Sequence, residues 1–177
     1  MKPSNILIKD GELYITGFSS SLDWSDRNSD ETEEQWDALP HRYAAPEIMQ
    51  AEKRDSSSDI WSLGCVYLEM WTALKGRKVY RQVDMHDIEG PSYTEIDPEN
   101  EIARMEALPG PPSDNLPIEW IRPMLQRDRK LRPTADALLS IIRDASTKLD
   151  AEHMFIGQCC LHEGRETESA APSTGDA

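Results

Sequence analysis

The first hydrophobic positions of the chain predict a short β-hairpin. Apolar runs at residues 6–8 and 13–15 flank the dipeptide Asp10-Gly11, which is typical of a tight turn between two strands. We therefore expect two short antiparallel strands at the start of the chain.

A long apolar segment in the middle of the chain predicts a buried helix. From Ser56 to Leu74 apolar residues recur at helical spacing, and they fall on the remaining faces as well. A helix that is apolar all round is expected at the centre of a domain. Either Ser56 or Ser57 is expected to cap its start.

Three further helices are predicted towards the C-terminus. Pro98 begins the first, which ends at the Pro-Gly-Pro-Pro run of residues 109–112. Pro117 begins the second, with a kink or break expected at Pro123, and Thr134 caps the third. The buried face of that last helix is expected to hold Leu138, Leu139, Ile141 and Ile142. The predicted fold is therefore mainly α, a helical bundle around a buried central helix with a small N-terminal β-hairpin.

Two segments without a helical or strand period are expected to be loops. Residues 75–97 form one of them. Residues 19–40 form the other and carry seven acidic side chains beside Arg27, a pattern typical of a solvated acidic loop. An alternative interpretation of the acidic loop is a site of regulatory phosphorylation, with the candidates Ser25, Ser29 and Thr32.

The chain divides into one domain and a tail. Residues 1–145 are expected to form the domain and residues 146–163 a short extension. Residues 164–177 contain no large apolar residue and are expected to be disordered.

The composition excludes several classes of partner. The 33 Asp and Glu against 19 Lys and Arg give a net charge of −14, which argues against binding to nucleic acid or to anionic lipid.

Several features of the sequence bear on the location of the protein. The three cysteines are an odd number and do not form a set of disulfide pairs, and no apolar signal segment follows the N-terminus. The segment 60–74 carries Glu69 and is too short to span a bilayer. We expect an intracellular protein, cytoplasmic or nuclear, whose partner is another protein.

A cluster of His and Cys residues in the extension has two interpretations. Cys and His are zinc ligands, but adjacent cysteines rarely bind one tetrahedral ion and the spacing matches no zinc finger. The simpler interpretation is a short packed extension. The cluster consists of His153, Cys159, Cys160 and His162.

Five short motifs follow one another along residues 2–145. They are Lys2-Pro3-Ser4-Asn5-Ile6-Leu7-Ile8, Thr16-Gly17-Phe18-Ser19, Tyr43-Ala44-Ala45-Pro46-Glu47, Ser58-Asp59-Ile60-Trp61-Ser62-Leu63-Gly64 and Asp128-Arg129-Lys130-Leu131-Arg132-Pro133-Thr134-Ala135. In this order and spacing they resemble the C-terminal lobe of a eukaryotic protein kinase. The resemblance implies ATP-dependent protein phosphorylation as the family activity, with ATP and Mg²⁺ as family cofactors. Pro40 stands where Ser/Thr kinases commonly have a Thr, so the substrate class stays open.

The resemblance places two residues of the catalytic loop at the start of the chain. Lys2 matches the family's contact to the transferred phosphate, and Asn5 matches its ligand to a second magnesium ion. The proton-accepting Asp of the family belongs just before Met1, so we expect Lys2 and Asn5 to be vestigial.

The magnesium-binding Asp of the family's Asp-Phe-Gly motif is replaced. Gly17 occupies its position, Phe18 keeps the packing residue, and Ser19 stands in place of the glycine. Glycine has no side-chain oxygen, whereas magnesium is held by carboxylates and phosphate oxygens. We therefore expect no cofactor to be bound by this chain.

Three further residues match structural positions of the family. Glu47 and Arg132 match an ion pair that fixes the end of the activation segment, and we expect a carboxylate oxygen of Glu47 to contact the Arg132 guanidinium. Two exposed surface charges are the alternative for this pair. Asp59 matches the residue that holds the backbone of the catalytic loop, with an ordinary acid in the first turn of a helix as the alternative.

Three functions from different classes follow. The first is a partial protein kinase domain that is catalytically inactive as it stands. The second is a pseudokinase-type module that binds a protein partner. The third is an unrelated all-α interaction domain.

Overall fold

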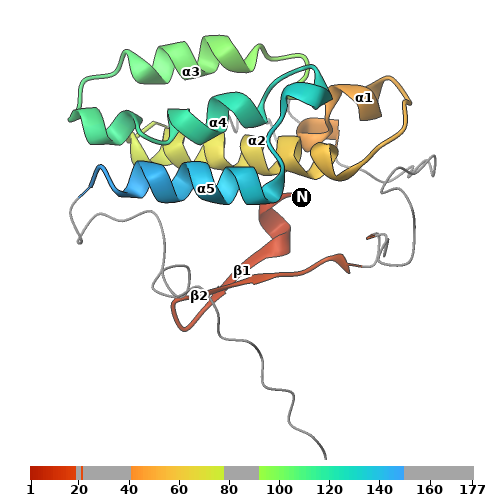
Figure 1. The fold of residues 1–177 in the computed structure, drawn as a ribbon, viewed down its shortest axis with the longest axis horizontal. Helices are drawn as coiled ribbons and strands as arrows, with labels where there is room; N and C mark the ends of the chain where they lie inside the picture. The colour runs from red at the N-terminus through yellow and green to blue at the C-terminus, as the bar shows by residue number, and fades with distance from the viewer. Residues whose placement is uncertain (19–20, 22–40, 78–91, 150–177) are drawn as a thin grey trace, which may run out of the picture.

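The computed structural model describes residues 1–18, 21, 41–77 and 92–149. Figure 1 shows a layer of helices with a small hairpin below it. In chain order the elements are η1 (Pro3–Asn5), β1 (Ile6–Lys9), β2 (Glu12–Ile15), η3 (His41–Tyr43), α1 (Pro46–Met49), α2 (Ser56–Leu74), α3 (Pro98–Glu106), η4 (Pro112–Asn115), α4 (Ile118–Met124), η5 (Arg129–Leu131) and α5 (Ala135–Ser146), where η marks a 3₁₀ turn.

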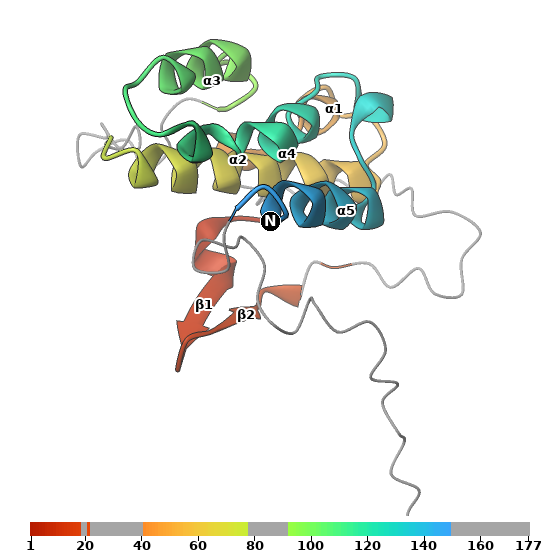
Figure 2. The same cartoon turned by 60° about the vertical axis from the view of Figure 1, so that its left-hand side comes forward.

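The predicted hairpin is confirmed. β1 and β2 pair antiparallel, with Ile6 opposite Ile15 and Ile8 opposite Leu13. Asp10 and Gly11 both have positive φ angles, 53° and 81°, as the tight turn of a two-residue hairpin requires. Figures 1 and 2 show that the hairpin points away from the helices. All of its apolar side chains except that of Ile6 are consequently exposed.

The long helix α2 lies against the other helices as predicted, with two corrections. Its N-cap is Asp55, whose carboxylate accepts a hydrogen bond from the Ser57 backbone N–H at 2.9 Å; a carboxylate accepts such a bond at least as well as a serine hydroxyl. The burial is not uniform either. Met70 and Leu74 at the C-terminal end of the helix are exposed, because the neighbouring helices cover only part of its surface.

The core lies between α2, α4 and α5 (Figure 2), and α3 packs against α4. α2 and α4 meet at Gly64. A Cβ atom there would lie 2.9 Å from the Met124 Cβ, which is closer than real Cβ contacts, and 3.0 Å from the Leu125 Cδ2, which is unusually tight. The fully buried side chains are large and apolar, and they comprise Trp61, Cys65, Trp71, Ile102, Met105, Ile121 and Met124.

The three later helices begin where they were predicted. Pro98 is the first residue of α3, Pro117 precedes α4, and Thr134 caps α5 by accepting a hydrogen bond from the Ala137 backbone N–H. α4 ends at Met124, one residue after the proline expected to break it.

The expected buried face of α5 is partly wrong. Leu138 is buried and Ile141 and Ile142 pack partly buried against the core, but Leu139 is 37% exposed. A side chain one position away from Leu138 is turned by a quarter of the helix circumference, towards solvent.

Several sequence predictions fall outside the described residues. They concern the acidic loop with Ser25, Ser29 and Thr32, the residue Pro40, most of the segment 75–97, the His and Cys cluster of the extension, and the tail. Among the described helices, none combines the length and the apolar character that a bilayer crossing would need.

Candidate functional site

Asn5 and Gly17 lie in direct contact. Asn5 ends the turn η1 and Gly17 follows β2, and the hairpin register brings the two together: the Thr16 backbone N–H donates to the Asn5 carbonyl at 2.8 Å. A Cβ on Gly17 would lie 2.6, 2.8 and 2.9 Å from the Nδ2, Cγ and Oδ1 atoms of Asn5. The Asn5 amide thus fills the space that a side chain at position 17 would occupy.

The backbone of Gly17 reinforces this arrangement. Its φ angle is +81°, a conformation that L side chains rarely adopt. At position 17 itself the structure therefore presents the neutral Asn5 amide and no side-chain carboxylate. Within the parts of the chain that the structure describes, no group of three or more His, Cys, Asp or Glu side chains is arranged to hold a metal ion.

Lys2 and Asp59 lie close to this turn. Lys2 precedes η1 with an extended backbone, and its carbonyl accepts a hydrogen bond from the Asn5 N–H at 3.0 Å. Asp59 lies in the first turn of α2 with an exposed side chain, and it accepts a hydrogen bond of 3.4 Å from the amino group of Met1. The acid predicted to hold the loop backbone thus contacts the residue adjacent to Lys2.

The predicted ion pair between Glu47 and Arg132 is present. Arg132 Nη1 donates to Glu47 Oε1 at 2.7 Å, and Nη2 donates to Oε2 at 2.8 Å. The arginine side chain is 0% exposed and the glutamate side chain 4%, which excludes the alternative of two exposed charges. The Ser58 hydroxyl adds a third hydrogen bond to Glu47, of 2.8 Å.

Arg132 also binds several backbone carbonyls. Its N–H groups donate to the carbonyls of Ser57, Gln126 and Arg127 at 2.8–3.2 Å, and its guanidinium lies 5.1 Å from the centre of the Trp61 ring. One side chain therefore joins α1, the start of α2 and the turn that follows α4. Burial alone would raise the pKa of Glu47, but hydrogen bonds from Arg132 and Ser58 hold the pKa of that carboxyl below its ordinary value.

The structure contains a second polar cluster, centred on Glu69, that the sequence analysis missed. The Glu69 carboxylate accepts hydrogen bonds from Arg42, from the Tyr43 hydroxyl at 3.1 Å, and from the Tyr93 hydroxyl at 2.8 Å. The Arg42 guanidinium also lies 4.9 Å from the centre of the Tyr93 ring. The available signal was a lone carboxylate inside an otherwise apolar helix, which a low-polarity environment tolerates only with partners.

This cluster, hereafter the Glu69 cluster, shifts the ionisation of both tyrosines. Burial and the neighbouring Glu69 carboxylate raise the pKa of Tyr43 to about 12. Burial and Glu69 raise the pKa of Tyr93 further above its ordinary value. Both hydroxyls are therefore protonated donors at neutral pH, as the hydrogen bonds to Glu69 require.

Comparison with known proteins assigns the chain to a family. The family model of the protein kinase domain matches residues 1–141, so the chain belongs to the protein kinase family. The alternative of an unrelated all-α domain is therefore wrong.

Individual kinases show moderate similarity. The chain is 28% identical over 166 residues to the G2-specific protein kinase fin1 of Schizosaccharomyces pombe, an alignment that covers 91% of this chain and 21% of fin1. It is 29% identical over 170 residues to the serine/threonine-protein kinase MPS1 of Encephalitozoon cuniculi, covering 94% of this chain and 25% of the relative. The chain thus spans a quarter or less of the length of these two relatives.

Proposed function

We propose that this chain is the C-terminal lobe of a protein kinase domain, and that its metal position is degenerate and does not support phosphoryl transfer. The single observation that carries the proposal is the contact between Gly17 and Asn5. Gly17 stands at the family's magnesium-binding Asp, and the Asn5 amide occupies the space beside it.

Magnesium chemistry explains why this contact matters. Phosphoryl transfer depends mainly on positioning and on stabilising charge, much of which magnesium supplies. Magnesium loses its water reluctantly and is held by carboxylates together with phosphate oxygens. One amide from Asn5 and one ammonium group from Lys2 are too few to order that ion on a nucleotide.

Calorimetric titration with ATP and Mg²⁺, together with radiolabelled phosphate transfer to a generic substrate, tests the proposal. We expect neither magnesium-dependent binding nor transfer by the 177-residue chain, and the variant Gly17→Asp is expected to stay inactive because the new side chain meets Asn5. A longer protein that contains these residues is expected to give the same result. Magnesium-dependent phosphate transfer by either protein would overturn the proposal.

A protein-binding module is the second candidate, and the exposed hairpin favours it. Ile8 is 77% exposed and Leu13 is 69% exposed, and their paired positions place them on one face of the sheet. Contiguous apolar surface of this kind marks an interaction site. In the kinase family such a hairpin packs against the rest of the kinase domain, so we propose that a protein surface covers it here.

A further inference from the structure

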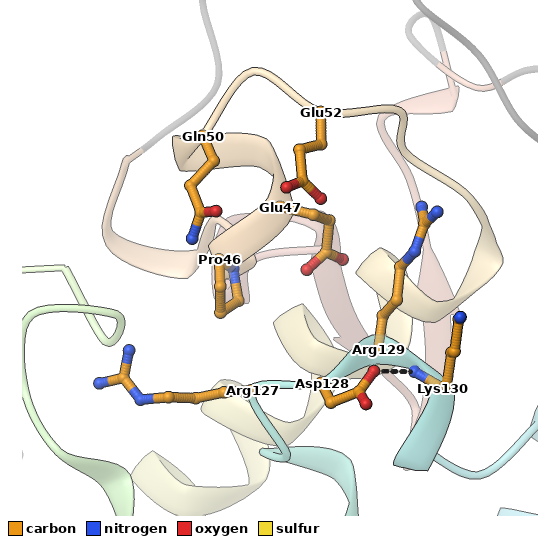
Figure 3. A pocket seen from close by; sticks show the side chains of 8 residues that line it. All are labelled: Pro46, Glu47, Gln50, Glu52, Arg127, Asp128, Arg129 and Lys130. Atoms are coloured by element: carbon orange, nitrogen blue, oxygen red, sulfur yellow. Dashed lines mark hydrogen bonds between the residues drawn. The ribbon is translucent and has the colours of Figure 1, made fainter.

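A pocket of about 370 Å³ lies between α1 and the turn that leads into η5 (Figure 3). Its lining holds three acidic and three basic side chains, so its charges balance and favour neither an acidic nor a basic partner. These side chains belong to Glu47, Glu52, Asp128, Arg127, Arg129 and Lys130. The hairpin of β1 and β2, in contrast, has one surface of a single chemical kind.

The register of the hairpin separates its side chains into two faces. Residues directly opposite in an antiparallel pair point to the same face, and so do residues two positions apart along a strand. One face therefore carries only aliphatic side chains, those of Ile6, Ile8, Leu13 and Ile15. This surface, hereafter the aliphatic face, presents neither a charge nor a hydrogen-bonding side chain.

The opposite face of the hairpin is largely polar. Lys9 lies opposite Glu12 in the register, which makes an oppositely charged cross-strand pair. The Tyr14 hydroxyl donates a hydrogen bond of 2.8 Å to a Glu12 carboxylate oxygen. An antiparallel sheet with one polar and one apolar face keeps the polar face in water and packs the apolar face against another element. The aliphatic face is therefore the side on which a partner is expected.

The described part of the chain leaves the aliphatic face open. Ile8, Leu13 and Ile15 are 77%, 69% and 53% exposed. Figures 1 and 2 show the hairpin projecting away from the helices. A partner can therefore reach this face without displacing a described helix.

Several properties of the aliphatic face fit a second copy of the same chain. The face is uncharged, so two copies can meet there although each carries a net charge of −14. The projection of the hairpin keeps the helices of two such copies apart. Aliphatic side chains pack against one another without requiring a complementary donor or acceptor, and a two-fold contact places the same surface on both sides.

The area of the aliphatic face sets the strength of such a contact. Covering its four side chains would remove roughly 400 Å² of surface per copy from water, or about 800 Å² for the pair, whereas standard stable interfaces bury about 1,200–2,000 Å². A contact of this size is weak and reversible. The area therefore predicts a dimer that forms at high protein concentration and dissociates on dilution.

We propose that the aliphatic face packs against the same face of a second copy of this chain, so that two hairpins stack about a two-fold axis. The two sheets lie about 10 Å apart, as in other face-to-face sheet packings, and the polar face with Lys9 and Glu12 stays in water. This inference rests on the proposed function in which a protein surface covers the hairpin, and it names that surface.

Sedimentation velocity of the 177-residue chain measures the equilibrium between monomer and dimer. The sedimentation coefficient is expected to rise between about 10 µM and about 1 mM protein, the range of a weak complex. Because the two copies repel each other, the dimer is expected to be tighter at about 0.15 M salt, where the Debye length is about 8 Å, than at about 0.01 M, where it is about 30 Å. A chain that stays monomeric over this range would overturn the proposal.

Two adjacent residues on opposite faces of β1 provide matched variants. Ile8→Thr keeps a β-branched residue in the strand and is expected to raise the Kd of the dimer by about tenfold or more, because a two-fold dimer contains the substitution twice. Leu7→Thr makes the same kind of change on the polar face and is expected to alter the Kd by no more than about twofold. Equal effects of the two variants would overturn the assignment of the contact to the aliphatic face.

Dye binding by the same variants separates this inference from the proposed function. A monomeric chain whose binding of a hydrophobic dye is weakened by Ile8→Thr would overturn the second copy as the partner, but the hairpin would remain a surface for another protein. A monomeric chain whose dye binding is unaffected by Ile8→Thr would contradict both. Phosphate transfer by the chain would overturn the proposal for the metal position and leave the dimer contact untouched.

Discussion

Arg132 and Glu47 lie 85 positions apart in the sequence, and two parallel hydrogen bonds of 2.7 and 2.8 Å join their side chains. Both side chains are almost completely withdrawn from water. Each carboxylate oxygen of Glu47 accepts a hydrogen bond from a different nitrogen of the Arg132 guanidinium. This bidentate pairing is the strongest form of hydrogen bonding between the two groups. The pair connects the short helix α1 to the turn before α5.

Removing one partner of this pair is expected to destabilise the fold strongly. Glu47→Gln or Arg132→Met leaves a buried charge without its counterion, which costs about 3 to 5 kcal/mol. Urea unfolding monitored by circular dichroism measures this loss. Glu52→Gln, an exposed carboxylate on the same segment, is the control and is expected to change the free energy of unfolding by less than about 0.5 kcal/mol. Similar midpoints for all three variants would contradict the structural role of the pair.

The contact between Gly17 and Asn5 predicts an energetic coupling. Gly17→Ala combines a strained positive φ with a clash against the Asn5 amide, so we expect a loss of roughly 1 to 3 kcal/mol. Gly11→Ala is a matched control, because Gly11 has the same φ angle of +81° and open space around its Cα. The smaller loss of stability expected for Gly11→Ala measures the strain of the positive φ angle without the clash.

Thermal unfolding of the double variant completes this test. Asn5→Ala removes the side chain that obstructs position 17, so Gly17→Ala is expected to destabilise that background less, with a coupling energy of about 0.5 kcal/mol or more. Strict additivity of the two substitutions would show that the amide does not fill the space.

The Glu69 cluster predicts a loss of stability at alkaline pH. The pKa of Tyr43 is raised from the ordinary value of 10.0 to about 12, so unfolded protein loses this proton at a lower pH than folded protein does. The stabilisation is therefore complete below pH 10 and disappears as the pH rises towards 12. Absorbance of tyrosinate near 295 nm, recorded beside circular dichroism, is expected to show Tyr43 and Tyr93 ionising together with unfolding.

Phenylalanine substitutions identify the hydroxyls responsible. Tyr43→Phe is expected to destabilise the protein at neutral pH by about 1.5 to 3 kcal/mol, because it removes a donor to the partly buried carboxylate of Glu69. Tyr14→Phe is the control, since its hydroxyl lies on the exposed hairpin and bonds the exposed Glu12. Equal effects of the two substitutions would argue against the cluster.

The exposed hairpin predicts binding of a hydrophobic dye. The purified chain is expected to raise the fluorescence of such a dye or to self-associate, because Ile8 and Leu13 present an uncovered aliphatic face. The variant Ile8→Thr with Leu13→Thr keeps the strand propensity and is expected to reduce the signal. An unchanged signal in this variant would place the dye site elsewhere.

The sequence predicted the elements better than the contacts between them. The hairpin and the helices followed from periodicity and from Asp, Thr and Pro residues at element ends, because these signals are local. The buried face of α5 was predicted only in part, since Leu138 and Leu139 are equally apolar and only packing against α4 decides which of them is buried.

Contacts between distant residues needed either a family resemblance or the structure itself. Glu47 and Arg132 could be paired in advance because both match family positions. The partners of Glu69 could not, because Tyr43 and Tyr93 lie 26 and 24 positions away on opposite sides of it and no periodicity relates them. The contact between the Asn5 amide and Gly17 likewise could not be predicted, because it depends on the positive φ angle of Gly17, which the residue type alone does not determine.

The absence of a side chain at Gly64 affects the geometry of the Glu47–Arg132 ion pair. α4 packs on α2 where Gly64 has no side chain. After α4 and its C-cap Leu125 the chain continues into Gln126 and Arg127, whose carbonyls accept hydrogen bonds from Arg132. A methyl group at position 64 would push α4 outwards by a few tenths of an ångström and carry those carbonyls with it. The distance between α2 and α4 therefore affects how well Arg132 can form its hydrogen bonds to the Glu47 carboxylate.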